Sequence, residues 1–249
     1  MQAFIKEIIF KEKTIEVVFS GCSFRCPFCK TPELIETKKE HEKELKEAIS
    51  LIKEYSNQAE EIIFTGGEPL LQRPALKQLM KLSKELKLRT KLKTSGTKPN
   101  VLRELTDLGY VDFIIFRIKS PLGTSLEKTT KSQTFFKNTE EIITDIKLSL
   151  KILKRNEDKI NIEFVTDIVP GLIFRKEEIE KIGNEISNIR SLWTLKQYFP
   201  DENVLSKIYR NISPPNEKFM ENLKEFLLEK FPEMIIQIKL SEADHKDQD

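Results

Sequence analysis

The chain is poor in cysteine and histidine, with three and two in 249 residues. It also lacks the run of roughly 18 or more apolar residues that a transmembrane helix needs, so the sequence predicts no membrane span. An odd number of cysteines does not suit the paired disulfides of a secreted domain, and we expect the thiols to stay reduced in the cytoplasm. The N-terminal stretch MQAFIKEIIFKEK has lysines inside its apolar part and no small-residue cleavage site, so we expect no signal peptide.

The chain also has no large excess of positive or negative charge. The 42 Lys and Arg residues against 40 Asp and Glu leave a net charge of +2, which predicts no general attraction to nucleic acid or to anionic membranes. One local exception is formed by Lys77, Lys81 and Lys84 on the face of an expected helix. Such a face could dock RNA, but a solvated helix face is the more common reason for this pattern.

Short β-branched or aromatic runs alternate with longer amphipathic segments, which is typical of βα units in a largely parallel α/β sheet. We expect strands near 14–19, 61–65, 88–94, 112–118, 160–168 and 192–199, and a terminal strand near 234–240. Helices are expected near 42–56, 74–86, 100–108, 138–155, 175–189 and 215–230. The sequence favours one domain over 1–249, with a core at about 14–199, a C-terminal helix and strand at about 214–240, and a polar tail at 241–249.

Five loop motifs follow the first five of these strands. They are GCSFRCPFC, GGEP, SGT, KSPL and VPGL, in chain order. Because ligands of parallel α/β sheets and barrels bind where the strands end, we expect these five loops to meet at one rim and to form the functional site.

All three cysteines lie in the first of these loops. Cys22, Cys26 and Cys29 have a C-x3-C-x2-C spacing, and thiolates are the usual ligands of iron–sulfur clusters. Packing of the cysteines in a core is the plain alternative, but the same loop carries Arg25 and Lys30, which does not fit a buried apolar strand. The spacing therefore favours a shared metal cluster.

A structural zinc ion would need a fourth protein ligand. Only His41, at the start of an expected helix, and His245, in the polar tail, could supply it as histidine. A Cys3His zinc site is thus a poor alternative. A four-iron cluster held by three cysteines would instead leave one iron without a protein ligand.

The cysteine loop resembles the signature of the radical S-adenosylmethionine (SAM) superfamily, which has the same spacing and an aromatic residue before the last cysteine, here Phe28. A second feature of that family is a Gly-Gly-Glu-Pro segment at the end of the second strand, here Gly66, Gly67, Glu68 and Pro69. The resemblance runs from about residue 14 to 199. It implies a 4Fe-4S cluster on Cys22, Cys26 and Cys29, with SAM bound to the open iron.

The same resemblance implies the fold and the reaction. The fold would be a partial (βα)6 barrel of the TIM-like type. The enzyme would use one electron, from a donor such as flavodoxin or ferredoxin, to cleave SAM to methionine and a 5′-deoxyadenosyl radical. That radical abstracts a hydrogen atom from the substrate, while the protein orients the cofactor and excludes water.

Within this superfamily the chain most resembles the activating enzymes of glycyl-radical proteins, in particular those of the anaerobic ribonucleotide reductases. The segments that carry this likeness are GCSFRCPFCKTPEL, TGGEPLLQ, TSGTKPNVLRELTDLGYVDFI, IKSPL, VPGL and LWTLKQYFP. The resemblance implies a glycyl-radical protein as the partner and substrate. Beyond the three cysteines the chain has no others, so we expect no auxiliary cluster.

The chain departs from that subfamily at two acidic positions. Activating enzymes typically carry aspartates where this chain has Lys93 and Arg117, and an arginine where it has Val165. One hypothesis is that a basic side chain holds the SAM carboxylate; the other is that the extra charge binds an anionic small molecule, nucleoside or RNA base. The residues expected to bind the cofactor are Phe28, Gly66, Gly67, Glu68, Pro69, Lys93, Ser95, Arg117 and Lys119.

Alternation along the strands extends this basic region. If Lys93 faces the lumen of the barrel, Arg89 and Lys91 face it too, with Glu163 and Asp167 as the nearby acids. For Arg89 and Lys91, a position at the solvated bottom of the barrel or a pair with Glu163 is an equally good interpretation.

Overall fold

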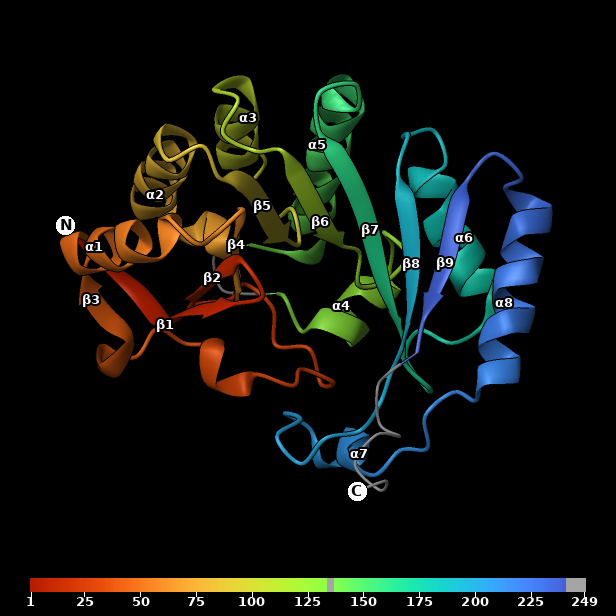
Figure 1. Ribbon diagram of the computed structural model, residues 1–249. Helices are drawn as coiled ribbons and strands as arrows, with labels where there is room; N and C mark the ends of the chain where they lie inside the picture. The colour runs from red at the N-terminus through yellow and green to blue at the C-terminus, as the bar shows by residue number, and fades with distance from the viewer. Residues whose placement is uncertain (134–136, 241–249) are drawn as a thin grey trace, which may run out of the picture.

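The computed structural model describes residues 1–133 and 137–240, and it forms one nine-stranded sheet with helices outside it (Figure 1). The strand order is β3-β1-β2-β4-β5-β6-β7-β8-β9. The strands are β1 (Gln2–Lys11), β2 (Thr14–Phe19), β3 (Glu42–Glu44), β4 (Glu61–Gly66), β5 (Arg89–Thr94), β6 (Phe113–Arg117), β7 (Asn161–Ile168), β8 (Leu192–Gln197) and β9 (Ile235–Lys239). The helices are α1 (Leu45–Ser56), α2 (Arg73–Glu85), α3 (Pro99–Asp107), α4 (Ser125–Thr130), α5 (Thr139–Asn156), α6 (Lys176–Ile186), α7 (Lys207–Arg210) and α8 (Glu217–Lys230), with 3-10 turns at Pro32–Leu34, Lys39–His41 and Pro69–Gln72.

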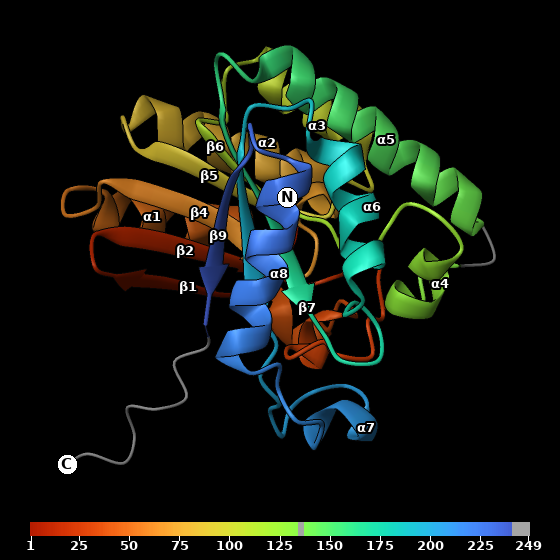
Figure 2. The ribbon, with the colours of Figure 1, turned by 90° about the vertical axis from the view of Figure 1, so that its right-hand side faces the viewer.

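The strand pairs from β2 through β9 are parallel, and β1 pairs antiparallel with both β2 and β3. It curves so that α1, α2, α3, α5, α6 and α8 cover its outer face (Figures 1 and 2). This is the partial TIM-like barrel of the α/β class that the sequence predicted. The parallel direction brings the ends of β2, β4, β5, β6, β7 and β8 to one rim, which is where the five loop motifs begin.

Side chains alternate between the helix-covered face and the inner face. On β5, Thr90 and Leu92 are fully buried under the helices, whereas Lys91 and Lys93 lie on the opposite face and are half-buried. The aromatic core continues on the next strands, where the rings of Phe116 and Phe164 meet edge to face at 5.6 Å. Apolar packing on the outer face therefore leaves the inner face free for polar side chains.

The structure differs from the prediction at the N-terminus, where it has an additional strand and where the first helix begins later than expected. Residues Gln2–Lys11 form β1, which turns back on β2 through Glu12 and Lys13, both with positive φ. A turn made by two charged residues in the left-handed region carries no glycine or asparagine signal. The helix expected from 42 begins at Leu45, because Glu42–Glu44 pairs with β1 as the short strand β3. Helices α4 and α7 were not expected.

No helix among the described residues has the length and apolar character of a membrane span.

Candidate functional site

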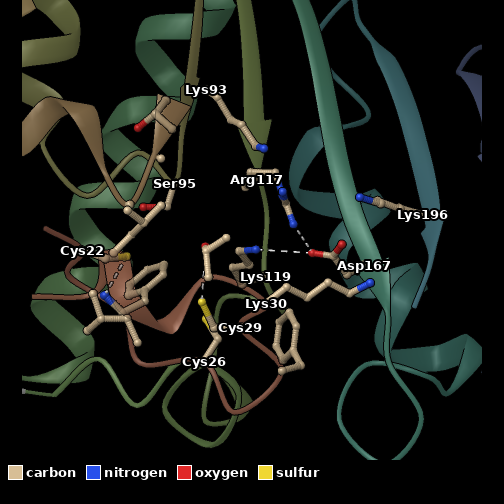
Figure 3. A pocket seen from close by; sticks show the side chains of 18 of the residues that line it. Cys22, Cys26, Cys29, Lys30, Lys93, Ser95, Arg117, Lys119, Asp167 and Lys196 are labelled. Carbon is tan, nitrogen blue, oxygen red and sulfur yellow. Dashed lines mark hydrogen bonds and ion pairs between the residues drawn. The ribbon is translucent and has the colours of Figure 1, made fainter. Parts of the chain in front are cut away.

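A pocket opens at the rim where the parallel strands end, beside the loop that follows β2 (Figure 3). Its wall comes from the cysteine loop on one side and from the ends of β4 through β8 on the other. The residues that line it are Cys22, Phe24, Cys26, Phe28, Cys29, Lys30, Thr31, Leu34, Ile35, Gly66, Gly67, Lys93, Thr94, Ser95, Arg117, Lys119, Asp167, Lys196, Gln197 and Tyr198. Four of the five loop motifs that the sequence placed at one rim contribute to this pocket, whereas VPGL, at 169–172, does not line it.

Backbone hydrogen bonds fix the cysteine loop. The amides of Gly21 and Cys22 each donate at 2.8 Å, to the carbonyl oxygens of Leu34 and Ile35. From the other side, the amide of Leu205 donates to the carbonyl oxygen of Cys29 at 2.9 Å. The loop is held between the 3-10 turn after it and the segment that follows β8, so its thiols have defined positions.

The three cysteines line the pocket together. Thiolates are the usual ligands of iron–sulfur clusters, and each protein thiolate of a four-iron cluster binds a different iron. The donor types in the pocket therefore fit that group. Burial raises the pKa of Cys22 to about 11 and that of Cys26 to about 12, which means that a cationic metal has to stabilise the thiolates.

His41 is not available as the fourth ligand of a zinc site in the pocket. His41 is buried, and its Nδ1 lies 2.8 Å from the hydroxyl of Ser20, outside the pocket lining. His245 lies outside the described residues. The donor set in the pocket is therefore three cysteines, as a site-differentiated 4Fe-4S cluster requires.

The glycine pair after β4 lies against the cysteine loop. A Cβ atom on Gly67 would lie 2.2 Å from the carbonyl oxygen of Gly21, and one on Gly66 would lie 2.1 Å from that of Phe19. The amide of Glu68 donates to the same Gly21 oxygen at 2.8 Å. The two glycines thus permit the contact of two backbones that places the cysteines beside the ends of β4 and β5.

Replacing Gly67 by alanine is expected to shift this contact, because the neighbouring atoms are backbone and cannot rotate away. Forced backbone shifts cost about 1–3 kcal/mol of unfolding free energy, and we expect a lower iron content after reconstitution as well. Gly123→Ala is the matched control, since a Cβ there would meet no atom within 4 Å. Denaturant unfolding and iron analysis of both variants test this; equal behaviour would contradict it.

Glu68 does not line the pocket but holds residues that do. Its carboxylate is 1% exposed and accepts hydrogen bonds from the Leu70 amide at 3.2 Å, the Thr94 hydroxyl at 2.7 Å, and the amide and hydroxyl of Ser95 at 2.8 and 2.5 Å. Burial raises its pKa, and these donors oppose that shift. The carboxylate therefore joins the end of β4 to the end of β5 and positions Ser95 in the wall.

Glu68→Gln is expected to destabilise the protein by about 1–3 kcal/mol, because one amide N–H group would face the donors that now meet a carboxylate oxygen. Glu85→Gln, on an exposed pair with Lys81 at 3.8 Å, is the control and should change stability by less than about 0.5 kcal/mol. Urea unfolding curves of the two variants measure the difference. No loss in Glu68→Gln would remove its positioning role.

Basic side chains dominate the other wall of the pocket. Arg117 and Lys119, from the end of β6, both donate to Asp167 on β7, and the Lys119 Nζ to Asp167 Oδ2 distance is 3.3 Å. Lys93 on β5 and Lys196 on β8 complete the group (Figure 3). With Lys30 from the cysteine loop, five basic side chains line the pocket together with one carboxylate, Asp167.

The crowding of positive charge changes the ionisation of these groups. Burial and the charges of Arg117, Lys119 and Lys196 lower the pKa of Lys93 to about 7. Burial also lowers the pKa of Lys196. The Asp167 carboxyl has its pKa held below its usual range by the neighbouring cations, although burial opposes this. The basic side chains of the pocket therefore outnumber its one carboxylate, Asp167.

The sequence-based expectations for the basic residues were partly right. Lys93 and Arg117 do share the pocket, but Arg89 and Lys91 are directed to Glu61, at 3.6 and 2.7 Å, at the opposite end of the strands. Of the two interpretations offered for Arg89 and Lys91, the pair with Glu163 is wrong, because that carboxylate accepts a hydrogen bond from the Thr194 hydroxyl at 2.5 Å. The position at the solvated end of the barrel is correct for Arg89, whose side chain is 68% exposed.

The wall also contains residues that were not among the predicted cofactor-binding set, and the most notable of these are Lys196, Lys30 and Tyr198. The letters LWTLKQYF hold a lysine in an otherwise apolar strand, which was the available signal for Lys196. Pro69, expected among the cofactor-binding residues, is buried and outside the pocket lining.

The lysines of α2 were considered as an RNA-docking face, and each of them faces an acid instead. Lys77 contacts Glu104 at 2.7 Å, and Lys84 contacts Asp112 at 2.6 Å. Lys81 has Glu85 at 3.8 Å. Paired lysines of this kind fit the solvated helix face that was the alternative.

Comparison with known proteins agrees with this site. The family model of the Radical SAM superfamily matches residues 17–186. MJ1227 of Methanocaldococcus jannaschii, which carries the name of a glycyl-radical enzyme activating enzyme, is 25% identical over 88% of this chain and 87% of its own. A pyruvate formate-lyase-activating enzyme of Clostridium pasteurianum is 30% identical over 71% of this chain and 70% of its own.

Two further similarities point to other members. A 7-carboxy-7-deazaguanine synthase of Clostridium acetobutylicum is 29% identical over 68% of this chain and 76% of its own. The solved structure of a radical SAM methyltransferase from Sphaerobacter thermophilus matches with a TM-score of 0.68 at 14% identity, over 95% of this chain and 69% of that one. At that identity the likeness concerns the fold alone.

Proposed function

The chain belongs to the Radical SAM superfamily, and on that premise we propose that it cleaves SAM reductively to start hydrogen-atom abstraction from a bound substrate. Members of this superfamily use a 4Fe-4S cluster and SAM. When bound, the reduced cluster supplies one electron to SAM, which yields methionine and a 5′-deoxyadenosyl radical that removes a hydrogen atom from the substrate.

The residues that would hold these groups all line the pocket. Cys22, Cys26 and Cys29 would bind three of the irons. Because Gly66 and Gly67 have no side chains, SAM could lie directly against their backbone. Phe28 packs edge to face on Tyr198 at 6.4 Å and lies 5.4 Å from the Nζ of Lys119. These rings would exclude water from the cluster.

Among substrate types, the geometry best supports an anionic small molecule, such as a metabolite, a nucleoside derivative or a modified base. One observation carries this proposal: five basic side chains line the pocket together with one carboxylate, Asp167. A pocket lined mainly by positive side chains, with few carboxylates to balance them, attracts an anionic ligand. The similarity to a 7-carboxy-7-deazaguanine synthase supports a small-molecule substrate.

The second candidate is the activating type, in which a glycyl-radical protein is the substrate. It is supported by the two relatives with activating-enzyme names, one of which aligns over 88% of this chain. In either case the electron would come from a donor such as flavodoxin or ferredoxin.

An electron paramagnetic resonance (EPR) spectrum tests the SAM site that both candidates share. Reduced holoenzyme is expected to change its cluster signal when SAM is added, because SAM would occupy the open iron. A signal that stays the same at saturating SAM would contradict the proposed enzymatic role.

A second measurement separates the two substrate types. The reduced enzyme with SAM is incubated with any glycyl-radical protein encoded in the same genome, and the sample is examined for a glycyl-radical EPR signal. We expect no such signal. Its appearance in stoichiometric amount would replace the small-molecule proposal by the activating one.

A further inference from the structure

The basic side chains of the pocket differ in whether they have a partner. Arg117 and Lys119 donate to Asp167. Lys93 and Lys196, by contrast, make no hydrogen bond or ion pair with any residue in the described part of the chain. The Nε atom of Arg117 is buried and also lacks a partner there. Three donor groups from β5, β6 and β8 are thus unused.

Two half-buried lysines outside the pocket have carboxylate partners. Lys91 is two residues before Lys93 on the same face of β5, and its Nζ lies 2.7 Å from Glu61. Lys84 has Asp112 at 2.6 Å. Other half-buried lysines, such as Lys43 and Lys98, have no ion pair among the described residues. The distinctive feature of the pocket is therefore that two unpaired lysines line it together with Arg117, whose Nε also lacks a partner, and unpaired cations in a partly buried site cost several kcal/mol.

The cofactors do not supply the missing negative charge. A cluster core with two positive charges and three cysteine thiolates carries about one net negative charge, and SAM carries about one net positive charge. Together they add about no net charge. The carboxylate of SAM could neutralise one lysine, but its ammonium and sulfonium groups enter with it. Among the described residues Asp167 is the only carboxylate in the lining, so an excess of positive charge remains.

We propose that Lys93, Lys196 and the Nε of Arg117 form a subsite for a doubly charged anionic group of the substrate, either a phosphate or a pair of carboxylates. This rests on the proposed function, since it places the substrate in the cluster pocket. Figure 3 shows Lys93, from β5, and Lys196, from β8, on the two sides of the Arg117–Asp167 pair, and these residues line the same pocket. Asp167 would keep Arg117 oriented, and a guanidinium beside ammonium groups suits a dianion.

The lowered pKa of Lys93, about 7, is consistent with this role. The groups that face it are Arg117, Lys119 and Lys196, which lower its pKa, and Asp167, which raises it. A bound anion would favour the charged lysine, so anion binding should strengthen as the pH falls through about 7.

Sulfate is a suitable probe, because it stays a dianion across that range. Its affinity is measured calorimetrically on the reconstituted holoprotein, with chloride holding the ionic strength constant. We expect Lys93→Gln and Lys196→Gln each to weaken sulfate binding by about tenfold, the effect of about 1.4 kcal/mol. The control Lys91→Gln should change it by less than about twofold, as its lysine is paired with Glu61 outside the pocket.

A melting experiment without sulfate separates binding from structure. Lys93→Gln is expected to melt at a higher temperature than the wild type, because it removes a repelled cation; a structural lysine would give a lower one. The proposal is overturned if sulfate does not bind the wild type, if Lys91→Gln weakens binding as much as Lys93→Gln, or if Lys93→Gln melts lower.

The failure of this subsite and that of the proposed function can be told apart. Formation of 5′-deoxyadenosine without lysine-dependent sulfate binding would reject the subsite alone. Lysine-dependent sulfate binding in a protein that does not cleave SAM would retain the subsite and reject the enzymatic role.

Discussion

Replacing Cys26 by alanine is expected to abolish stable cluster binding and, with it, SAM cleavage. The described part of the chain offers no fourth ligand in the pocket, since His41 is engaged with Ser20. A cluster with only two protein thiolates would lose iron during reconstitution. Iron and sulfide analysis after anaerobic reconstitution and desalting gives the result directly.

Ser23→Ala is the control for this experiment, because Ser23 lies in the same loop and its only hydrogen bond to a described residue is a long one, 3.5 Å to Thr97. It should load iron like the wild type. Full iron content and activity in Cys26→Ala would contradict the ligand role. The same outcome is expected for Cys22→Ala and Cys29→Ala.

Asp167→Asn is expected to cause the largest loss of stability, about 3–5 kcal/mol, because it leaves basic side chains without their shared carboxylate. The side chains of Asp167, Arg117 and Lys119 are 10%, 19% and 16% exposed, so solvent compensates poorly. Urea unfolding of the apoprotein at pH 7 measures the loss.

The pH dependence of this loss has a defined sign. The pKa of Asp167 is lowered on folding, so its contribution is complete above the ordinary aspartate pKa of about 4 and declines as the pH falls below it. The difference between wild type and variant should therefore shrink on acidification.

Asp158→Asn is the control, since Asp158 is 87% exposed and meets Arg190 at 3.4 Å. Such surface pairs contribute about 0–1 kcal/mol. Equal losses in the two variants, or a loss in Asp167→Asn that grows toward low pH, would contradict the account.

The sequence was sufficient for the elements whose pattern is local. The strands near 61–65 and 192–199 appear as Glu61–Gly66 and Leu192–Gln197, because their apolar residues are bounded by turn signals. The rim of loop motifs followed from the parallel direction of the strands, which is a property of the topology. The cysteine spacing and the glycine pair needed no tertiary information either.

What the sequence did not predict depends on contacts between distant residues. Glu61 is the first residue of β4 and Glu163 the third of β7. Only the structure shows that Lys91 pairs with Glu61, whereas Glu163 accepts a hydrogen bond from the Thr194 hydroxyl. Glu68 was grouped with the cofactor-binding residues, but its four hydrogen bonds make it a positioning residue. Lys196 lies in the site because β8 pairs with β7, where Lys196 is the register partner of Asp167. The sequence alone does not show this pairing.

The central claim is that three cysteines in this pocket support reductive cleavage of SAM. The most direct test is to reconstitute the protein anaerobically with iron and sulfide, reduce it with SAM present, and quantify 5′-deoxyadenosine by chromatography. We predict that wild type forms it and that Cys26→Ala does not. A wild-type protein with a fully loaded, reduced cluster that forms no 5′-deoxyadenosine would contradict the account.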